Sequence, residues 1–273
     1  MVASVIPWLL HWQLVPDGPV QVRESGVVQP VRTADGQSAV LKIMVDAQER
    51  LGAQLLQAWQ GDGAARVLAL AEDALLMERL PGPAALALAQ SGDAMAAVQA
   101  VCDCAAELHA HAPLPLAAQL PSVAQWLQAL ESYPASFGTG RDVMAQCAQL
   151  ARQLLAQPDA TQVLHGDLHQ DNVLRAADGS WKAIDPKGVV GERSFELALL
   201  LCNPEQPWAD RAALLAAAAH IANASAFDLQ RLLQWAAVRA ALSAAWFAED
   251  GATQRVHAQQ ELAQRILSEL LKK

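Results

Sequence analysis

The stretch VLHGDLHQDNVLRAADGSWKAIDPKG, residues 163–188, stands out from the apolar chain around it. Between its apolar residues it carries two His, four Asp, one Asn and two Lys. Core strands and helices do not need that mixture, because buried polar side chains cost free energy unless they find partners. Three interpretations are open at this point: a polar turn between two strands, a metal site, or the centre of an enzyme.

Three oxygen-bearing side chains of this stretch are expected to converge. Asp167 and Asn172 lie close together in the chain, and Asp185 follows at the end of a second strand. Because Asp178-Gly179 predicts a hairpin turn, the return strand brings Asp185 back beside the loop. Carboxylate and amide oxygens suit Mg²⁺, which keeps coordination positions for phosphates. A carboxylate left off the metal could accept a proton from an attacking hydroxyl.

A capped turn and a phosphoesterase centre would also use these residues. In a turn, Asp and Asn side chains cap the backbone and Asp185 ends a strand before Pro186. In a phosphoesterase, GDLH would resemble a G-D-x-H metal motif, which needs an earlier D-x-H and a later G-N-H segment to build two metal sites. Neither segment occurs in the sequence. His109 and His111 are interpreted as residues at the end of a helix.

A kinase would need a further feature upstream, a cation on a strand of a small lobe where it can reach the nucleotide phosphates. The segment AVLKI, residues 39–43, meets this demand, because Lys42 is the one charged residue in an apolar, strand-like run. Glu49 in the following helix is a candidate partner for Lys42. The apolar strand in ALLMERLPG leads out of this region, and its backbone from Glu78 to Leu80 is placed to hydrogen-bond adenine.

The chain divides into a strand-rich first part and a helical remainder. The first part has short apolar strands, a hairpin signal at Asp35-Gly36 and one helix predicted at 46–59. Pro81-Gly82-Pro83 then breaks the chain. After that break Ala, Leu and Gln predominate. Helices are predicted there at 92–111, 122–130, 141–156, 194–203, 208–222, 227–248 and 253–271.

Composition narrows the possible partners. The chain has 273 residues, of which 53% are hydrophobic, enough for a sizeable buried core. Charged residues make up 17% and are spread along the chain, unlike a disordered segment. The net charge of −9 argues against nucleic acid or an anionic membrane as a partner.

Cysteine usage and the apolar segments predict a cytoplasmic protein. The four cysteines form no C-x-x-C pair and no disulfide framework, which favours reduced thiols. The apolar N-terminus lacks a basic start and carries Pro7 and His11, so it is not interpreted as a signal peptide. The longest apolar stretch, 212–227, is interrupted by His220 and Asn223, and a buried helix is expected there instead of a membrane span.

HGDLHQDN followed by AIDPKG resembles the catalytic segment of the aminoglycoside phosphotransferase superfamily. The D-P-K-G form, in place of D-F-G, is similar to the branch holding streptomycin 6-phosphotransferases and hydroxyurea phosphotransferases. QPVRTADGQSAVLKI, LLMERLPG and GERSFELALLL also resemble that branch. The resemblance implies an α+β, bilobal protein-kinase-like fold with ATP in the cleft. Its N-lobe, residues 1–80, would hold a small antiparallel sheet with one helix, and its C-lobe, residues 81–273, would be larger and mostly helical.

The resemblance also implies roles for the polar residues. Asp167 would be the catalytic base that orients the substrate hydroxyl. Asn172 and Asp185 would hold Mg²⁺ on the phosphates, and Lys42 would contact the α- and β-phosphates. His165 would brace the catalytic loop through backbone hydrogen bonds.

Three more residues are assigned to the nucleotide site. Ser25 and Gly26, in RESGVV, are predicted to form the turn that covers the phosphates, although no G-x-G-x-x-G occurs. Lys187 follows the metal-binding Asp185 by two residues. Its basic side chain can meet a phosphate or pair with a carboxylate, and the sequence leaves both open.

Two departures from the family pattern leave alternatives open. Glu49 is assigned to the nucleotide site, but Gly52 occupies the next equivalent position on the helix, so the partner of Lys42 is not fixed. Phe195-Glu196 stands where the family usually has Tyr-Asp. Glu196 is expected to cap or anchor the following helix.

The sequence therefore predicts an ATP- and Mg²⁺-dependent kinase that phosphorylates a hydroxyl on a small molecule. The resemblance implies a cationic aminoglycoside such as streptomycin as acceptor, and a role in antibiotic resistance. The alternatives are a nucleotide-binding pseudokinase or regulatory protein, and a kinase of an unrelated small metabolite. The sequence does not give the oligomeric state. The carboxylates considered for a cationic acceptor are Glu192, Glu205, Asp210, Glu249 and Asp250.

Overall fold

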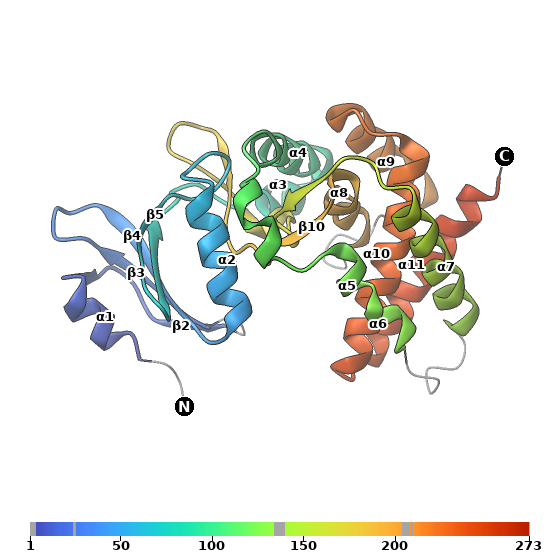
Figure 1. Ribbon diagram of the computed structural model, residues 1–273. Coiled ribbons are helices and arrows are strands. Elements are labelled where there is room, and N and C mark those ends of the chain that lie inside the picture. The colour runs from blue at the N-terminus through green and yellow to red at the C-terminus, as the bar shows by residue number, and fades with distance from the viewer. Residues whose placement is uncertain (1–3, 24–25, 134–139, 204–207, 209, 273) are drawn as a thin grey trace.

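The protein has two lobes, one built on a sheet and one built from helices (Figure 1). The computed structural model describes residues 4–23, 26–133, 140–203, 208 and 210–272. The N-lobe sheet lies at one side of Figure 1 and the long C-lobe helices at the other, with a β-hairpin between them. The predicted α+β bilobal fold is confirmed, whereas the exact boundary between residues 80 and 81 stays a prediction.

The N-lobe sheet is antiparallel throughout, with strand order β1-β3-β4-β6-β5 and β2 paired to β3 as well. The predicted turn at Asp35-Gly36 joins β3 to β4, and Gly36 takes the left-handed backbone conformation with φ of +85°. The strands are β1 (Val15–Pro16), β2 (Gln21–Arg23), β3 (Gly26–Arg32), β4 (Ser38–Met44), β5 (Val67–Leu70) and β6 (Ala74–Glu78).

Two helices, not the single one predicted, belong to the N-lobe. The additional helix, α1 (Ile6–His11), forms from the apolar N-terminal segment, with a proline in its first turn, where a missing N–H does no harm. Trp8 and Trp12 pack with it against the apolar outer face of the sheet, where Leu41 and Ile43 are buried. The prediction missed this helix because its apolar residues serve a sheet face and show little helical periodicity.

Helix α2 (Ala47–Ala58) covers the opposite face of the sheet. Asp46 caps its first turn by accepting a hydrogen bond of 2.9 Å from the backbone N–H of Glu49. Gly52 lets this helix approach the C-lobe, because a Cβ at that position would lie 2.1 Å from the carbonyl oxygen of Pro186. The glycine in this helix therefore serves close packing between the lobes.

The C-lobe packs its helices around α10, which contacts α7, α8, α9 and α11. Its apolar side chains merge with those of α2 into one large core. The predicted helices are all present within a few residues of their expected ends. The helices are α3 (Leu86–Gln90), α4 (Ala94–Ala110), α5 (Val123–Trp126), α6 (Gln128–Glu131), α7 (Arg141–Ala156), α8 (Arg193–Cys202), α9 (Arg211–Ser225), α10 (Leu229–Glu249) and α11 (Thr253–Leu270).

Two small antiparallel strand pairs lie between the lobes and hold the polar stretch. Strands β8 (Val173–Arg175) and β9 (Trp181–Ala183) form the predicted hairpin, and β7 (Thr161–Leu164) pairs with β10 (Val189–Glu192). The segment that joins the lobes runs along β8, since Gly82 N–H donates to Arg175 O over 3.0 Å. The hairpin is therefore tied to both lobes.

Among the described residues, no single helix is long and apolar enough to cross a bilayer. The consecutive helices α9 and α10 pass that test only as a pair, with a bend of 119° between them.

Candidate active site

A cavity of about 570 Å³ opens between the N-lobe sheet, α2 and the hairpin. Its apolar wall comes from both lobes, with Val28, Val40 and Met77 from the sheet and Leu174 and Ile184 from the hairpin. Several residues predicted for the nucleotide and metal sites also line it. They are Lys42, Glu49, Glu78, Leu80, Asn172 and Asp185.

Lys42 faces this cavity because side chains alternate along β4. Leu41 and Ile43 point to the outer face of the sheet under α1, so Lys42 between them points inward. Its ammonium group forms ion pairs with both Glu49 and Asp185. The lysine is only 6% exposed. Glu49, in the first turn of α2, is therefore its partner, and Gly52 is not an alternative position for one.

Asp185 lies two residues after the end of β9, in a conformation that is unusual for a residue with a side chain, with φ of +61°. Such a backbone costs free energy and is typical of residues held for function. Burial alone would raise the pKa of this carboxyl, but the charges of Lys42 and Lys187 outweigh that effect and hold the pKa below its usual value. Asp185 is therefore an anion at neutral pH.

Lys187 resolves the alternatives that the sequence left open for it. Its Nζ lies 2.7 Å from Oε1 of Glu49, so it pairs with a carboxylate in this structure. Burial lowers the pKa of Lys187, yet the hydrogen bond and charge of Glu49 outweigh it and raise the pKa overall. Asp185, Lys42, Glu49 and Lys187 thus alternate in sign across the interface between the lobes.

Asp167 and Asn172 come together in the loop after β7. The side-chain amide of Asn172 donates to the backbone oxygen of Asp167 over 2.9 Å, and it lies 3.5 Å from Oδ2 of the same residue. Ile184 N–H donates to Asn172 O, which places the loop beside the residue before Asp185. The side chain of Asp167 is about one-third exposed, at 35%, and open to an incoming acceptor.

His165 is fully buried beneath that loop and braces it through backbone hydrogen bonds. Its Nε2 lies 2.9 Å from the carbonyl oxygen of Ile184, and its Nδ1 accepts from the N–H of Asp167 over 3.2 Å. These contacts require the neutral ring with a proton on Nε2. Burial lowers the pKa of His165, which keeps it in that form. His165 therefore connects the Asp167 loop with the segment between β9 and Asp185.

Glu196 anchors the same loop, a role that the sequence interpretation placed in the following helix. It lies in the first turn of α8, and its carboxylate accepts from Gly166 N–H over 2.6 Å and from His165 N–H over 3.2 Å. His109 completes the arrangement, with Nε2 3.1 Å from Oε2 of Glu196. His109 was predicted only as a helix-end residue. Glu196 stands out in the sequence as a carboxylate directly before the apolar run LALLLC, whereas His109 shares α4 with Asp103 and Glu107 and has no comparable signal.

The structure gives less information on the four remaining residues predicted for the nucleotide site, Ser25, Gly26, Glu78 and Leu80. Ser25 lies outside the described residues. Gly26 begins β3 with φ of +135°, and a Cβ there would lie 2.0 Å from Ile43 O, so strand pairing alone requires a glycine. The Glu78 side chain accepts from Arg66 N–H and from Lys182, both over 2.8 Å. Leu80 lines the cavity at the end of the strand that leads out of the N-lobe.

Two of the five carboxylates considered for a cationic acceptor, Glu192 and Asp210, have structural roles. Glu192 is buried and binds Arg231 through both oxygens, so it is not open to a ligand. Asp210 caps α9. Glu249 and Asp250 are exposed at the end of α10. Glu205 lies outside the described residues.

The arrangement fits one kind of metal site better than another. Within the described part of the chain, no group of three or more His, Cys, Asp and Glu residues is placed to hold a metal ion. A two-metal phosphoesterase centre needs such a group. A magnesium ion that is bound mainly by nucleotide phosphates needs only one or two protein oxygens. Asn172 and Asp185, which line the same cavity, supply oxygens of that kind.

Comparison with known proteins agrees with this geometry. Residues 11–251 match the family described as "Aminoglycoside/hydroxyurea antibiotic resistance kinase". The chain is 41% identical over 250 residues to streptomycin 3''-kinase of Klebsiella pneumoniae, covering 88% of this chain and 91% of that protein. It is 34% identical over 196 residues to streptomycin 6-kinase of Streptomyces griseus, covering 68% of this chain and 62% of that protein.

The fold likeness extends further than the sequence likeness. The crystal structure of a thermostable mutant of aminoglycoside phosphotransferase APH(4)-Ia, in ternary complex with ADP and hygromycin B, superposes with a TM-score of 0.72 at 13% identity. That likeness covers 99% of this chain and 100% of the other. The predicted fold, family and phosphotransferase class are confirmed. This chain belongs to the aminoglycoside/hydroxyurea antibiotic resistance kinase family.

Proposed function

We propose that this protein transfers the γ-phosphoryl group of ATP to a hydroxyl of streptomycin or a closely related aminoglycoside. The observation that carries the proposal is the convergence of Lys42, Asn172 and Asp185 on one cavity, with Asp167 beside Asn172 at its edge. Phosphoryl transfer needs a cation on the phosphates, oxygen ligands for a metal and a carboxylate near the acceptor. All of these are within one site.

ATP would lie in the cavity between the lobes. The apolar walls from the sheet and the hairpin offer two faces for adenine, and the free backbone of Leu80 offers it an edge. Among the described residues the Leu80 N–H has no hydrogen-bond acceptor. Lys42, which is held by Glu49, would contact the α- and β-phosphates. The proposal assigns Ser25 and Gly26 to the turn above the phosphates.

Asn172 and Asp185 would hold Mg²⁺, which neutralises charge on the phosphates when it is bound. Lys42 occupies one oxygen of Asp185 in this structure. Binding of the nucleotide would draw that ammonium group onto phosphate oxygens and free the Asp185 carboxylate. Glu49 would keep a cationic partner throughout, because Lys187 also binds it.

Asp167 would accept the proton of the attacking hydroxyl and orient that hydroxyl toward the γ-phosphate. Asn172 restrains the carboxylate from one side, and His165 restrains the Asp167 backbone from beneath. A charge-bearing base that is held at two points loses little entropy on reaching the reactive geometry. Most of the acceleration would come from this positioning.

The acceptor is proposed from the relatives. The relative that shares 41% identity is named for the 3'' position of streptomycin, and the one that shares 34% is named for the 6 position. We favour the 3''-hydroxyl, in place of the 6-hydroxyl implied by the sequence resemblance. Antibiotic resistance would be the physiological role.

The reaction is proposed to take place in the cytoplasm. ATP is supplied there, and thiols remain reduced there. All four cysteines are free and buried in the structure.

The test is an ADP-release assay with the full chain over a panel of acceptors: streptomycin, other aminoglycosides, hydroxyurea and small hydroxylated metabolites. Streptomycin is expected to give the highest kcat/KM, in a reaction that requires Mg²⁺. NMR of the purified product, through coupling of the new phosphate to sugar protons, is expected to place the phosphate on the 3'' oxygen.

Two results would contradict the proposal at different levels. A phosphate on the 6 oxygen would correct the position but leave the substrate class intact. ATP binding without ADP release for any acceptor would instead make the chain a nucleotide-binding protein without transferase activity.

A further inference from the structure

One charged side chain of the C-lobe core is not accounted for by the roles described so far. Arg239 lies in the middle of α10, within the apolar run WAAVRAALSAAW. It is only 2% exposed. A guanidinium group that is taken out of water costs free energy unless it is well paired. No carboxylate forms an ion pair with it among the described residues, and its Nε and Nη1 have no hydrogen-bond partner there.

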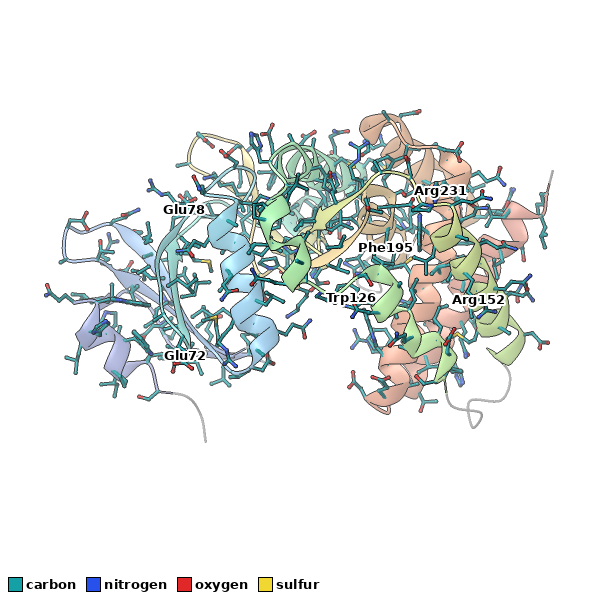
Figure 2. The ribbon with its side chains drawn as sticks, viewed as in Figure 1. Glu72, Glu78, Trp126, Arg152, Phe195 and Arg231 are labelled. Atoms are coloured by element: carbon teal, nitrogen blue, oxygen red, sulfur yellow. The ribbon has the colours of Figure 1, made fainter. Side chains whose placement is uncertain are left out.

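Aromatic rings surround this guanidinium in place of carboxylates. Its carbon lies 4.7 Å from the ring centre of Phe195, 5.6 Å from that of Trp126 and 5.9 Å from that of Trp246. Trp126 and Phe195 are both labelled in Figure 2 and come from α5 and α8. Cation–π attraction offsets part of the cost of burying the charge. It gives the charge a fixed place without neutralising it.

Among the described residues, the one hydrogen bond of Arg239 goes to the loop that carries Asp167. Its Nη2 donates to the carbonyl oxygen of Gly166 over 2.8 Å. That carbonyl belongs to the peptide unit between Gly166 and Asp167, and the N–H of the same unit donates to Nδ1 of His165. Both polar groups of the peptide that precedes the Asp167 side chain are therefore held by buried side chains. Its plane cannot rotate without breaking one of these bonds.

The rest of Gly166 is held as firmly. Its N–H donates to Oε1 of Glu196 over 2.6 Å. Its φ is +85°, and a Cβ there would lie 2.8 Å from the Trp126 ring, which also covers Arg239. A buried anion and a buried cation thus bind one glycine, joined through its backbone and not through each other.

We propose that Arg239 is a positioning residue of this kinase: through Gly166 O it fixes the peptide plane from which the Asp167 carboxylate projects toward the acceptor. The inference rests on the proposed function, in which Asp167 acts as the base. Stability alone does not account for Arg239, because apolar residues of similar size often replace buried charges at no loss. Loss of the bond would leave the loop folded but free to tilt.

The chain offers a matched control two turns earlier on the same helix. Arg231, labelled in Figure 2, binds Glu192 through Nε over 2.7 Å and through Nη2 over 2.5 Å. It is paired in full and does not contact the catalytic loop. Arg231→Met should lower the Tm, because it leaves Glu192 buried without its cation, and it should spare the kcat of the folded enzyme. Arg239→Met should instead leave the Tm unchanged and lower kcat.

The test compares Arg239→Met, Arg239→Lys and Arg231→Met in the full chain, with streptomycin as acceptor. Arg239→Met is expected to lower kcat by about tenfold to a hundredfold, since small misplacements of a reacting group cost that much. KM for ATP should stay within about twofold, because Arg239 lies outside the nucleotide cavity. Arg239→Lys keeps the charge but not the reach, and should fall between the wild type and Arg239→Met.

Hydrogen exchange supplies a readout that needs no turnover. The amides of residues 165–168 should exchange faster in Arg239→Met, at an unchanged Tm, and should not change in Arg231→Met. Wild-type kcat and wild-type exchange in Arg239→Met would overturn the inference. If that variant does not fold, Arg239→Lys decides, and full activity with unchanged exchange overturns it. A wild type without transferase activity would defeat the proposed function alone, while the exchange comparison still decides the role of Arg239.

Discussion

Two groups of ionisable side chains meet at the loop that carries Asp167, and their charges and hydrogen-bonding groups find partners in different ways. The first group, the cleft network, lies in the interface between the lobes. Its members are Lys42, Glu49, Asp185 and Lys187. The second group, the loop platform, lies beneath the loop in the C-lobe. Its members are His109, His165, Glu196 and Arg239.

The cleft network binds mainly itself, whereas the loop platform binds backbone. Lys42 has two carboxylate partners and Glu49 has two ammonium partners, so one partner of each can be exchanged for a phosphate or a metal. Glu196 instead accepts from the N–H of Gly166, and Arg239 donates to its C=O. Among the described residues, neither of these two backbone groups has a second hydrogen-bond partner that could be exchanged for a ligand. The first arrangement suits ligand binding, and the second suits a rigid support.

Removal of Asp167, the proposed base, has the largest expected effect. Asp167→Ala should reduce kcat by about 10²- to 10⁴-fold, the usual contribution of a general base. ATP affinity should change little, because Asp167 does not line the nucleotide cavity. ADP release and calorimetric titration with ATP measure the two quantities.

Asp178→Ala is the matched control for that variant. Asp178 lies at the tip of the β8–β9 hairpin, and among the described residues its side chain hydrogen-bonds to Ser180. It should retain wild-type kcat. Near-normal turnover in Asp167→Ala would show that Asp167 is not the base.

A break in the loop platform should cost stability as well as activity. Glu196→Ala removes an anion that accepts from two backbone N–H groups and from His109. Loss of one member of a buried charged arrangement costs about 3–5 kcal/mol of unfolding free energy. Urea unfolding followed by tryptophan fluorescence measures it. A loss similar to that of an exposed carboxylate, such as Glu249→Ala, would mean that the platform is not a support.

The difference between the two groups also accounts for what the sequence could predict. The cleft network was largely predicted, because AVLKI and AIDPKG place its charges in short segments at fixed spacing. In the loop platform, the bracing role of His165 was expected, because it lies in the polar stretch itself. The other three members, His109, Glu196 and Arg239, come from α4, α8 and α10, which the chain brings together only by folding. Long-range convergence of this kind leaves no local pattern.

One signal for the platform was nevertheless present. Lys42 was recognised as a lone charge in an apolar run, and Arg239 in WAAVRAALSAAW has the same property. The first was found because phosphoryl transfer requires a cation on a strand of the small lobe. Strand β10 and helix α1 were missed for a different reason, since each is apolar on a face that only the tertiary structure defines.

Substitution of the two lysines of the cleft network tests whether its ion pairs can be exchanged for contacts with the nucleotide. Lys42→Met should reduce kcat/KM for ATP by about tenfold to a hundredfold, because a cation on developing phosphate charge is lost. Lys187→Met should reduce it only about twofold to fivefold, the strength of a partly exposed ion pair. Its side chain is 27% exposed, and Glu49 would keep Lys42. Equal losses for the two variants would mean that Lys187 contacts the nucleotide directly.

The smallest expected effect is a change of unfolding free energy in mild acid, to which the loop platform should contribute and the cleft network should not. Burial lowers the pKa of His165 below its ordinary 6.5, so below that pH the unfolded chain binds a proton that the folded chain refuses. Unfolding free energy should therefore be full above pH 6.5 and fall below it, by at most about 1.4 kcal/mol per pH unit.

The carboxylates of both groups should contribute to acid unfolding only at lower pH. Burial raises the pKa of Glu196, but His109 and the loop N–H groups outweigh it, and the folded pKa lies below the ordinary 4.5. For Asp185, the charge of Lys42 likewise outweighs burial, and the folded pKa lies below the ordinary 3.8. The stabilisation from these two carboxylates is thus present at pH 5.5 and lost in stronger acid.

Urea unfolding measures the free energy of unfolding at pH values between about 7.5 and 5.5. A plot of that free energy against pH should have a slope that His165→Gln removes. The control is His257→Gln, at an exposed position of α11, which should retain the slope. A wild type without any slope in this range would mean that His165 is not held neutral, and the loop platform would then lack the ring that accepts from Asp167 N–H.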